Sequence, residues 1–169
     1  MWKLGLLATA LLLALPACQT VYKTAGEVSE ATTIEYDAYE KTTWVQGPIV
    51  TYSGFSNRCF LRTLVSDSGV RVNQLYVVYR PSEWAFLERA HDRLGNQLDA
   101  TVIDRDVSRN ASLSEHVAVR LGDAYLEDAA DVGLDIQVSG DHGSTVVRLP
   151  AHYVHGYLQV LAGFLARSE

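Results

Sequence analysis

The stretch RCFLRTLVSDSGVRVNQLYVVY, residues 58–79, decides the fold class of this chain. Its two flanks, residues 58–66 and 70–79, are rich in Val, Thr, Tyr and Leu, which favour extended strands. Between them Asp67-Ser68-Gly69 is a tight-turn sequence, because glycine readily adopts the backbone angles that hairpin turns require. The stretch therefore predicts two neighbouring antiparallel strands.

Two segments upstream have a similar composition, residues 34–39 and 43–52. Gly47-Pro48 interrupts the second segment, and proline cannot donate to a strand ladder, so we expect a sheet edge or a bulge there. With the hairpin at 58–79, these segments predict a series of sequential antiparallel strands.

Residues 82–104 allow two interpretations. A helix could run from Ser82 to Leu94 and end before Gly95. Alternatively, strands at 84–91 and 97–104 could surround a Gly95-Asn96 turn. We favour the hairpin, because it continues the antiparallel series and leaves no isolated short helix.

The C-terminal third predicts both strands and helices. Three further strands are expected, at residues 116–121, 134–139 and 145–149. A short helix near 123–132 follows the first of them, with Asp123 as its N-cap and Gly133 as its terminator.

The last predicted element is an amphipathic helix near residues 150–166. Pro150 suits the first turn of a helix. Apolar side chains then recur at helical spacing, at Val154, Tyr157, Leu158, Leu161, Phe164 and Leu165. Such a stripe must pack on an apolar surface, most simply one face of the sheet. The expected class is α+β, with a mainly antiparallel sheet.

Composition limits the class of protein. The chain has 169 residues, of which 48% are hydrophobic and 20% charged, so it is too apolar for a disordered protein. Its formal net charge of −6 argues against a nucleic-acid partner, which requires a basic face. Its two cysteines form neither a disulfide scaffold nor a four-cysteine zinc site. Residues 34–169 are expected to form a single domain.

The N-terminus carries the most specific signal in the chain. Lys3 precedes an apolar run over residues 4–15, and Pro16-Ala17-Cys18 follows. A positive start, a short hydrophobic run and small residues at its end are typical of a secretory signal peptide. The run is shorter than the about 20 apolar residues that a membrane-spanning helix needs. We therefore expect residues 1–17 to be removed on export.

Leu15-Pro16-Ala17-Cys18 resembles the lipobox of bacterial lipoproteins. The resemblance implies cleavage before Cys18 and acylation of this residue with fatty acids such as palmitate. Each buried CH₂ group contributes about 0.8 kcal/mol, so several acyl chains would hold the protein on a membrane. Gln19, which is not Asp, implies the outer membrane under the enterobacterial sorting rule. Residues 18–33 are polar and are expected to form a tether.

Two groups of side chains are candidate contact sites. His152, His155 and Gln159 lie on the side of the last helix opposite its apolar stripe, where they could face a partner. This histidine pair has no third ligand in its motif, so we expect no metal site. The second group consists of aromatic residues with polar tips in the first strands, which could form a binding platform: Tyr36, Tyr39, Trp44 and Tyr52.

No catalytic motif is evident, and no cofactor is expected. Ser139-Gly140-Asp141-His142-Gly143-Ser144 has the composition of a hairpin loop, and Cys59 lies in an apolar strand where a cysteine is usually inert. We expect a lipid-anchored envelope protein with a non-enzymatic binding or scaffolding role at the periplasmic face of the outer membrane. Its partner would be another envelope protein or peptidoglycan. The alternatives are a glycan- or peptidoglycan-binding module that uses exposed aromatics, and a small envelope hydrolase.

Overall fold

The computed structural model describes residues 22–53 and 56–167, and the elements below are those of the described residues. In chain order they are α1 (Ala25–Ala31), β1 (Thr33–Asp37), β2 (Thr42–Gln46), β3 (Val50–Thr51), β4 (Arg58–Ser66), β5 (Arg71–Tyr79), β6 (Leu87–Asp92), β7 (Gln97–Leu98), β8 (Ala100–Val107), β9 (Leu113–Leu121), α2 (Asp123–Val132), β10 (Leu134–Gly140), β11 (Ser144–Leu149) and α3 (Ala151–Leu165). The predicted α+β class is confirmed.

The strands of the described residues form two antiparallel sheets. Sheet A has the order β1-β2-β4-β5-β9-β8, with β3 as a further partner of β4. Sheet B has the order β11-β10-β6-β7. The predicted hairpin at 58–79 is β4 and β5, and Gly69 adopts the positive φ of 83° that its turn requires.

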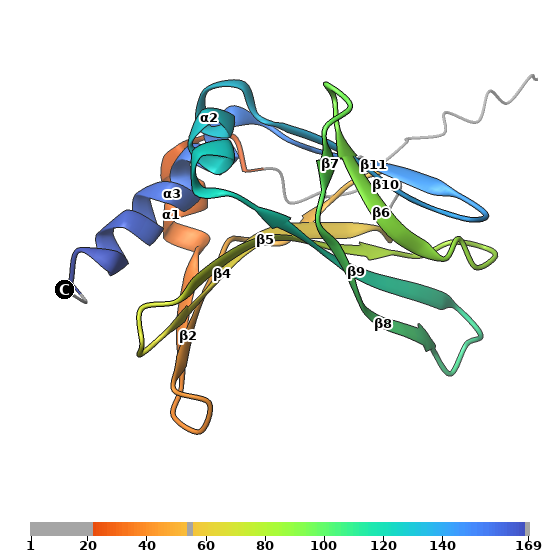
Figure 1. Ribbon diagram of the computed structural model, residues 1–169, viewed down its shortest axis with the longest axis horizontal. Helices are drawn as coiled ribbons and strands as arrows, with labels where there is room; N and C mark the ends of the chain where they lie inside the picture. The colour runs from red at the N-terminus through yellow and green to blue at the C-terminus, as the bar shows by residue number, and fades with distance from the viewer. Residues whose placement is uncertain (1–21, 54–55, 168–169) are drawn as a thin grey trace, which may run out of the picture.

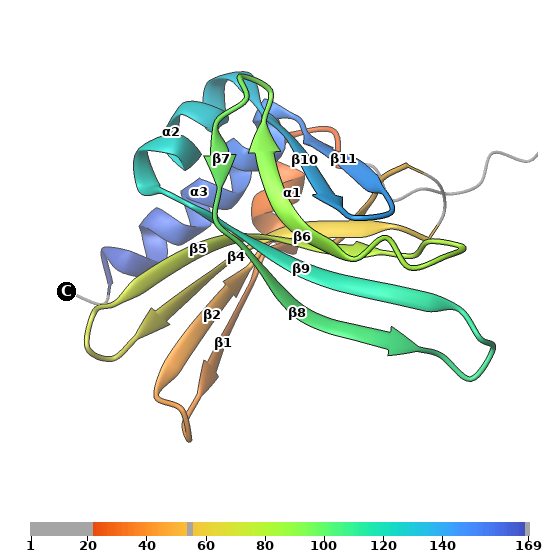
Figure 2. The same ribbon diagram turned by 45° about the vertical axis from the view of Figure 1, so that its right-hand side comes forward.

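Sheet B and the helices lie on the same side of sheet A (Figures 1 and 2). Its other side carries no helix or strand of the described residues and is concave: the β1–β2 hairpin bends down at one end and the β8–β9 hairpin at the other (Figure 1). We call this side the uncovered face of sheet A. It is the part of the fold that positions the candidate site.

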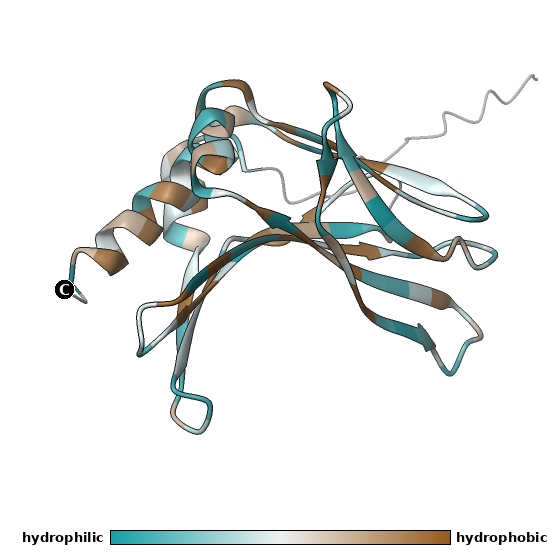
Figure 3. Cartoon of the chain, in the orientation of Figure 1, coloured by the Kyte–Doolittle hydropathy of each residue, from teal (hydrophilic) through white to brown (hydrophobic). Residues whose placement is uncertain are grey.

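Alternation along the strands separates the two sides of sheet A. Leu61, Leu75 and Val117 are fully buried on the side that faces the helices and sheet B. α3 packs on this side through Tyr153, Tyr157 and other apolar side chains, as the predicted stripe requires. Figure 3 shows hydrophobic residues alternating with hydrophilic ones along the strands. The stripe predicted from spacing omitted Tyr153, which is 1% exposed.

The interruption at Gly47-Pro48 is confirmed. It separates β2 from β3, and both strands pair with β4. The amide of Gly47 donates to the carbonyl of Leu61 at 2.8 Å, and a Cβ atom on Gly47 would lie 2.8 Å from the Tyr153 hydroxyl. The close approach of α3 therefore requires glycine at this break.

Residues 82–104 contain strands and no helix, so the favoured hairpin is confirmed. β6 and β7 pair around a turn in which Gly95 has a φ of 86°. The second arm of the hairpin then divides at Asp99, because β7 belongs to sheet B and β8 to sheet A. The Asp99 carbonyl accepts from the Arg120 amide at 2.7 Å, which fixes this corner between the two sheets.

The helix at 123–132 is confirmed, but the predicted cap is wrong. Gly122 is the N-cap and makes no side-chain capping bond. The Asp123 carboxylate instead forms an ion pair with Arg71 and accepts from the Asn73 amide at 2.6 Å. It therefore ties the start of α2 to β5. Gly133 ends the helix with a φ of 83°.

The predicted tether is wrong for its second half, because residues 25–31 form α1 and β1 begins at Thr33. Thr24 caps this helix by accepting from the Glu27 amide at 3.2 Å. α1 packs so closely on α3 that a Cβ atom on Gly156 would lie 2.2 Å from the Ala25 carbonyl oxygen. The signal peptide, Cys18 and the rest of the tether lie outside the described residues.

Candidate functional site on the uncovered face of sheet A

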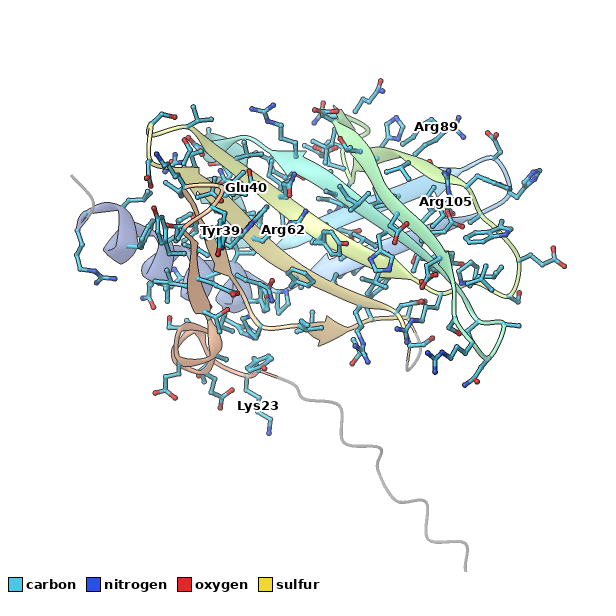
Figure 4. The ribbon with its side chains drawn as sticks, turned by 90° about the horizontal axis from the view of Figure 1, so that it is seen from below. Lys23, Tyr39, Glu40, Arg62, Arg89 and Arg105 are labelled. Atoms are coloured by element: carbon cyan, nitrogen blue, oxygen red, sulfur yellow. The ribbon has the colours of Figure 1, made fainter. Side chains whose placement is uncertain are left out.

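Four polar or aromatic side chains cross the centre of the uncovered face. Trp44, Arg62, Tyr76 and His116 come from the neighbouring strands β2, β4, β5 and β9. Trp44 opposes Leu64, which points to the same side of β4 as Arg62 because the two are two residues apart. His116 opposes Val78, which points to the same side of β5 as Tyr76 for the same reason. Strand register therefore places the four side chains on one side of the sheet. We call this set the Arg62 row. Figure 4, which views the sheet from below, shows Arg62 over its middle strands.

Arg62 is held between two aromatic rings. Its guanidinium carbon lies 4.6 Å from the centroid of the Trp44 ring and 4.2 Å from that of Tyr76. Its Nε donates to the side-chain oxygen of Gln74 at 2.8 Å. Cation–π contacts of this kind contribute about 0.5–2 kcal/mol each and orient the planar guanidinium. Arg62 is therefore fixed in direction.

The charge of Arg62 has no acidic partner among residues 22–53 and 56–167, where no carboxylate oxygen lies within 4 Å of it. Burial lowers the pKa of the guanidinium, and the nearby Tyr76 hydroxyl acts in the opposite direction. A half-buried cation without a counter-ion retains hydrogen-bond donors for a group outside the protein. This is the main chemical property of the face.

Tyr76 extends the row towards β9. Its hydroxyl lies 2.9 Å from Nδ1 of His116, and its ring packs on Phe60 with centroids 5.1 Å apart. Burial raises the pKa of the Tyr76 hydroxyl, the positive charge of Arg62 opposes this shift, and Asp104 adds to it. The row is thus a connected surface that runs from Trp44 to His116.

The row is supported from the opposite side of the sheet. Thr63, the neighbour of Arg62 on β4, is fully buried and donates to the side-chain oxygen of Asn73 at 2.9 Å. Its hydroxyl also lies 2.6 Å from the Tyr157 hydroxyl on α3. The hydrogen bonds of β4 and β5 behind the row are therefore satisfied, and α3 holds these strands in place.

A hollow lies beside Arg62 at the β1–β2 end of the face. It measures about 180 Å³ and is lined by Thr33, Glu35, Trp44, Gln46 and Arg62. Among the described residues no basic nitrogen lies within 4 Å of the Glu35 carboxylate, so the hollow presents both an acid and a base.

The four aromatic residues predicted to form a platform do not share one surface. Trp44 belongs to the Arg62 row, but Tyr36 opposes Thr43 and lies on the other side of the sheet, with 55% of its surface exposed. Tyr39 is 97% exposed in the β1–β2 turn, and Tyr52 is only 8% exposed. Of the four, only Trp44 lies in the Arg62 row, because strand register decides which side chains share a face.

The predicted partner face of α3 is partly covered by the chain itself. Ser29 of α1 donates to the Gly156 carbonyl at 2.8 Å and to the side-chain oxygen of Gln159 at 3.1 Å. The His152 ring bonds to the Tyr22 carbonyl at 2.8 Å, whereas His155 remains exposed beside Gln159. α1 and Tyr22 thus cover part of this side of α3, and His155 and Gln159 stay exposed on it.

Within the part of the chain that the structure describes, the remaining candidates form no group of reactive side chains. Burial raises the pKa of the Cys59 thiol to about 12, and the thiol is fully buried. His142 packs edge-on against Phe86 in the β10–β11 turn. In residues 22–53 and 56–167, no three His, Cys, Asp or Glu side chains could share a metal ion. The same residues contain no helix long and apolar enough to cross a membrane.

Sequence reasoning did not find Arg62, Tyr76 or His116. Alternation within residues 58–66 does place Arg58, Phe60, Arg62 and Leu64 on one side of a strand, which is a usable signal. The neighbours from β2, β5 and β9 could not be found in this way, because their strand pairing is not local in sequence. The capping-box sequence Thr24-Ala25-Gly26-Glu27 would have indicated α1.

Comparison with known proteins gives no relative from which a function could be transferred. No protein-family model, no curated protein and no solved structure matches this chain. Its function is therefore argued from the geometry of the uncovered face and from the N-terminal sequence.

Proposed function

We propose that this protein is a lipid-anchored, non-enzymatic protein of the bacterial envelope, facing the periplasm from the outer membrane, and that it binds another envelope component on the uncovered face of sheet A. The observation that carries the binding role is the Arg62 row. There a half-buried cation, stacked between Trp44 and Tyr76, lies on a face that no helix or strand in residues 22–53 and 56–167 covers.

The proposed attachment rests on the lipobox-like sequence that ends at Cys18. Only residues 19–21 separate Cys18 from Tyr22, whose carbonyl bonds to His152 at the start of α3. Four residue steps span at most roughly 14 Å. The folded domain would therefore lie close to the lipid, and its partner would be a component that reaches the membrane surface.

The described residues support binding more than catalysis. A hydrolytic nucleophile needs a base within hydrogen-bond reach and access to substrate. Cys59 is fully buried, and the partners of His116, His152 and His155 are respectively a tyrosine, a backbone carbonyl and a glutamine. The Arg62 row instead offers hydrogen-bond donors and ring surfaces of the kind that binding surfaces use.

Attachment is tested by fractionating cells that produce the Cys18→Ser variant. The variant should leave the membrane fraction and appear in the soluble periplasm. Continued sedimentation with membranes would contradict the proposed anchor.

The binding surface is tested by photo-crosslinking in intact cells. A photoreactive residue replaces Arg120, which is exposed and opposes Gln74 on the uncovered face. The control carries the same residue at Glu127, which is exposed on α2. A discrete crosslinked product at position 120, absent at 127, is expected. Equal products at both positions, or none at 120, would refute the assignment of the face.

A further inference from the structure

We infer that the hollow beside Arg62 binds one sugar unit of a neutral glycan strand. This inference rests on the proposed function and names the chemical class of the ligand for the same face. It follows from the size of the hollow, from its hydrogen-bonding groups, from its charge and from its position within the sheet.

The size of the hollow limits what can enter it. Its volume of about 180 Å³ is below the roughly 300–1,000 Å³ of pockets that enclose a drug-sized ligand. One sugar ring or its substituent can occupy this space, while the rest of a longer ligand extends over the concave face. The hollow is therefore a subsite on an extended surface.

The lining groups match the chemistry of a sugar ring. Each sugar hydroxyl both donates and accepts hydrogen bonds. Arg62 supplies donors only, Glu35 supplies acceptors only, and the Gln46 amide and the Thr33 hydroxyl supply both. Trp44 adds an apolar ring surface and an indole N–H donor for the carbon–hydrogen face and the edge of a sugar.

The charges of the hollow favour a neutral ligand. The unpaired positive charge of Arg62 and the unpaired negative charge of Glu35 balance one another within the hollow. The whole chain carries a formal charge of −6, which repels an acidic polymer. A neutral glycan avoids this repulsion and can hydrogen-bond to both charged groups.

The position of Arg62 argues against a peptide strand as the occupant. Peptides that add to a sheet pair with the free backbone groups of an edge strand. β4 has partners on both sides, β2 and β5, so its backbone groups are already used. A ligand that lies over Arg62 and Trp44, away from the edge strand β1, meets side chains only, because β2 also has partners on both sides. Rings and hydroxyls suit these side chains.

The test uses the mature acylated protein in detergent micelles, titrated with a short oligosaccharide of N-acetylglucosamine. Trp44 and Trp84 are the two tryptophans beyond the predicted signal peptide, so intrinsic fluorescence reports binding. A saturable change is expected, and Trp44→Phe should abolish it. The matched control, Trp84→Phe, should retain it, because Trp84 packs on Phe86 outside the hollow.

A second pair of variants tests the donors. Arg62→Gln should weaken binding at least about tenfold, because it removes hydrogen bonds to a charged group. Arg148→Gln on β11 should leave the affinity unchanged. If Arg62→Gln does not fold, Gln46→Ala replaces it, because Gln46 lines the hollow without taking part in the stack.

Two results would overturn the inference: no binding of the neutral oligosaccharide, or binding of a uronic-acid oligosaccharide only. Either result, together with a crosslinked partner at position 120, would reject the ligand class and leave the proposed function standing. Oligosaccharide binding without any membrane attachment would instead reject the anchor and leave the glycan site standing.

Discussion

Glu115 is a buried charged residue, and the structure gives a sharp prediction of how much stability the protein loses when this charge is removed. Its side chain on β9 is 1% exposed. Oε1 accepts from the amides of Ala85 and Phe86 at 2.7 and 3.1 Å, and Oε2 accepts from the Leu87 amide at 2.7 Å. Arg105 lies 3.5 Å from Oε2. The carboxylate thus joins the start of β6 in sheet B to sheet A.

Replacing Glu115 by Gln keeps the shape of the side chain but substitutes an NH₂ group for one oxygen. If the remaining oxygen keeps its hydrogen bonds from the Ala85 and Phe86 amides, the new NH₂ group faces the Leu87 amide and Arg105. These are hydrogen-bond donors like the NH₂ group itself, so no hydrogen bond can form there. Hydrogen bonds to charged groups contribute about 1.5–3 kcal/mol each, and breaking a buried ion pair costs about 3–5 kcal/mol. We expect Glu115→Gln to lower the free energy of unfolding by about 3–5 kcal/mol.

The assay is equilibrium unfolding in urea, followed by circular dichroism. A matched control is Glu88→Gln, because Glu88 pairs with Arg89 at 3.2 Å while both side chains are 47% exposed. The control should change the free energy of unfolding by less than about 1 kcal/mol. If Glu115→Gln costs no more than Glu88→Gln, the carboxylate does not join the sheets as described.

Three further predictions concern other parts of the fold. Gly156→Ala should destabilise the protein by about 1–3 kcal/mol in urea unfolding, because its methyl group would collide with the Ala25 carbonyl; an unchanged midpoint would contradict the close packing of α1 on α3. Cys59, with a pKa raised to about 12 by burial, should not react with a thiol reagent at neutral pH until urea unfolds the chain, whereas rapid labelling of the folded protein would refute its burial. The hydrogen bond from Arg71 lowers the pKa of Asp123, so its stabilisation is present above the unfolded pKa near 3.9 and is lost as the pH falls through the folded value. Because Asp123 is half exposed, Asp123→Asn should lower the free energy of unfolding in urea by less than about 1 kcal/mol near neutral pH, and by nothing in acid; a difference that persisted in acid would exclude this cause.

Most strands and helices of this fold could be predicted from local sequence patterns. β4 and β5 follow from their composition and from Gly69, and α2 ends where Gly133 predicts. These features depend on contacts between residues close in sequence, for which side-chain type and spacing are sufficient information. The division of one predicted strand between two sheets at Asp99 could not be predicted, because both parts of this strand have a strand-forming composition.

Much less of the candidate site could be predicted from the sequence. Trp44 was selected as an aromatic, but Tyr36 and Tyr52 were selected with it, and strand register places these residues in different environments. The buried carboxylate of Glu115 has no local signal at all, since its donors lie about thirty residues away along the chain. Burial and partnership of polar groups depend on the whole fold.

By itself, then, the sequence determined most of the strands, the helices α2 and α3, the glycine that ends α2 and the place of a lipobox-like motif. The tertiary structure decided that residues 25–31 cover α3 and that Arg62 lies between Trp44 and Tyr76 on the uncovered face of sheet A. The physical reason is that the two kinds of interaction act over different distances along the chain. Backbone preference acts over a few residues, whereas the environment of a side chain is set by strands that pair after long separations in the chain.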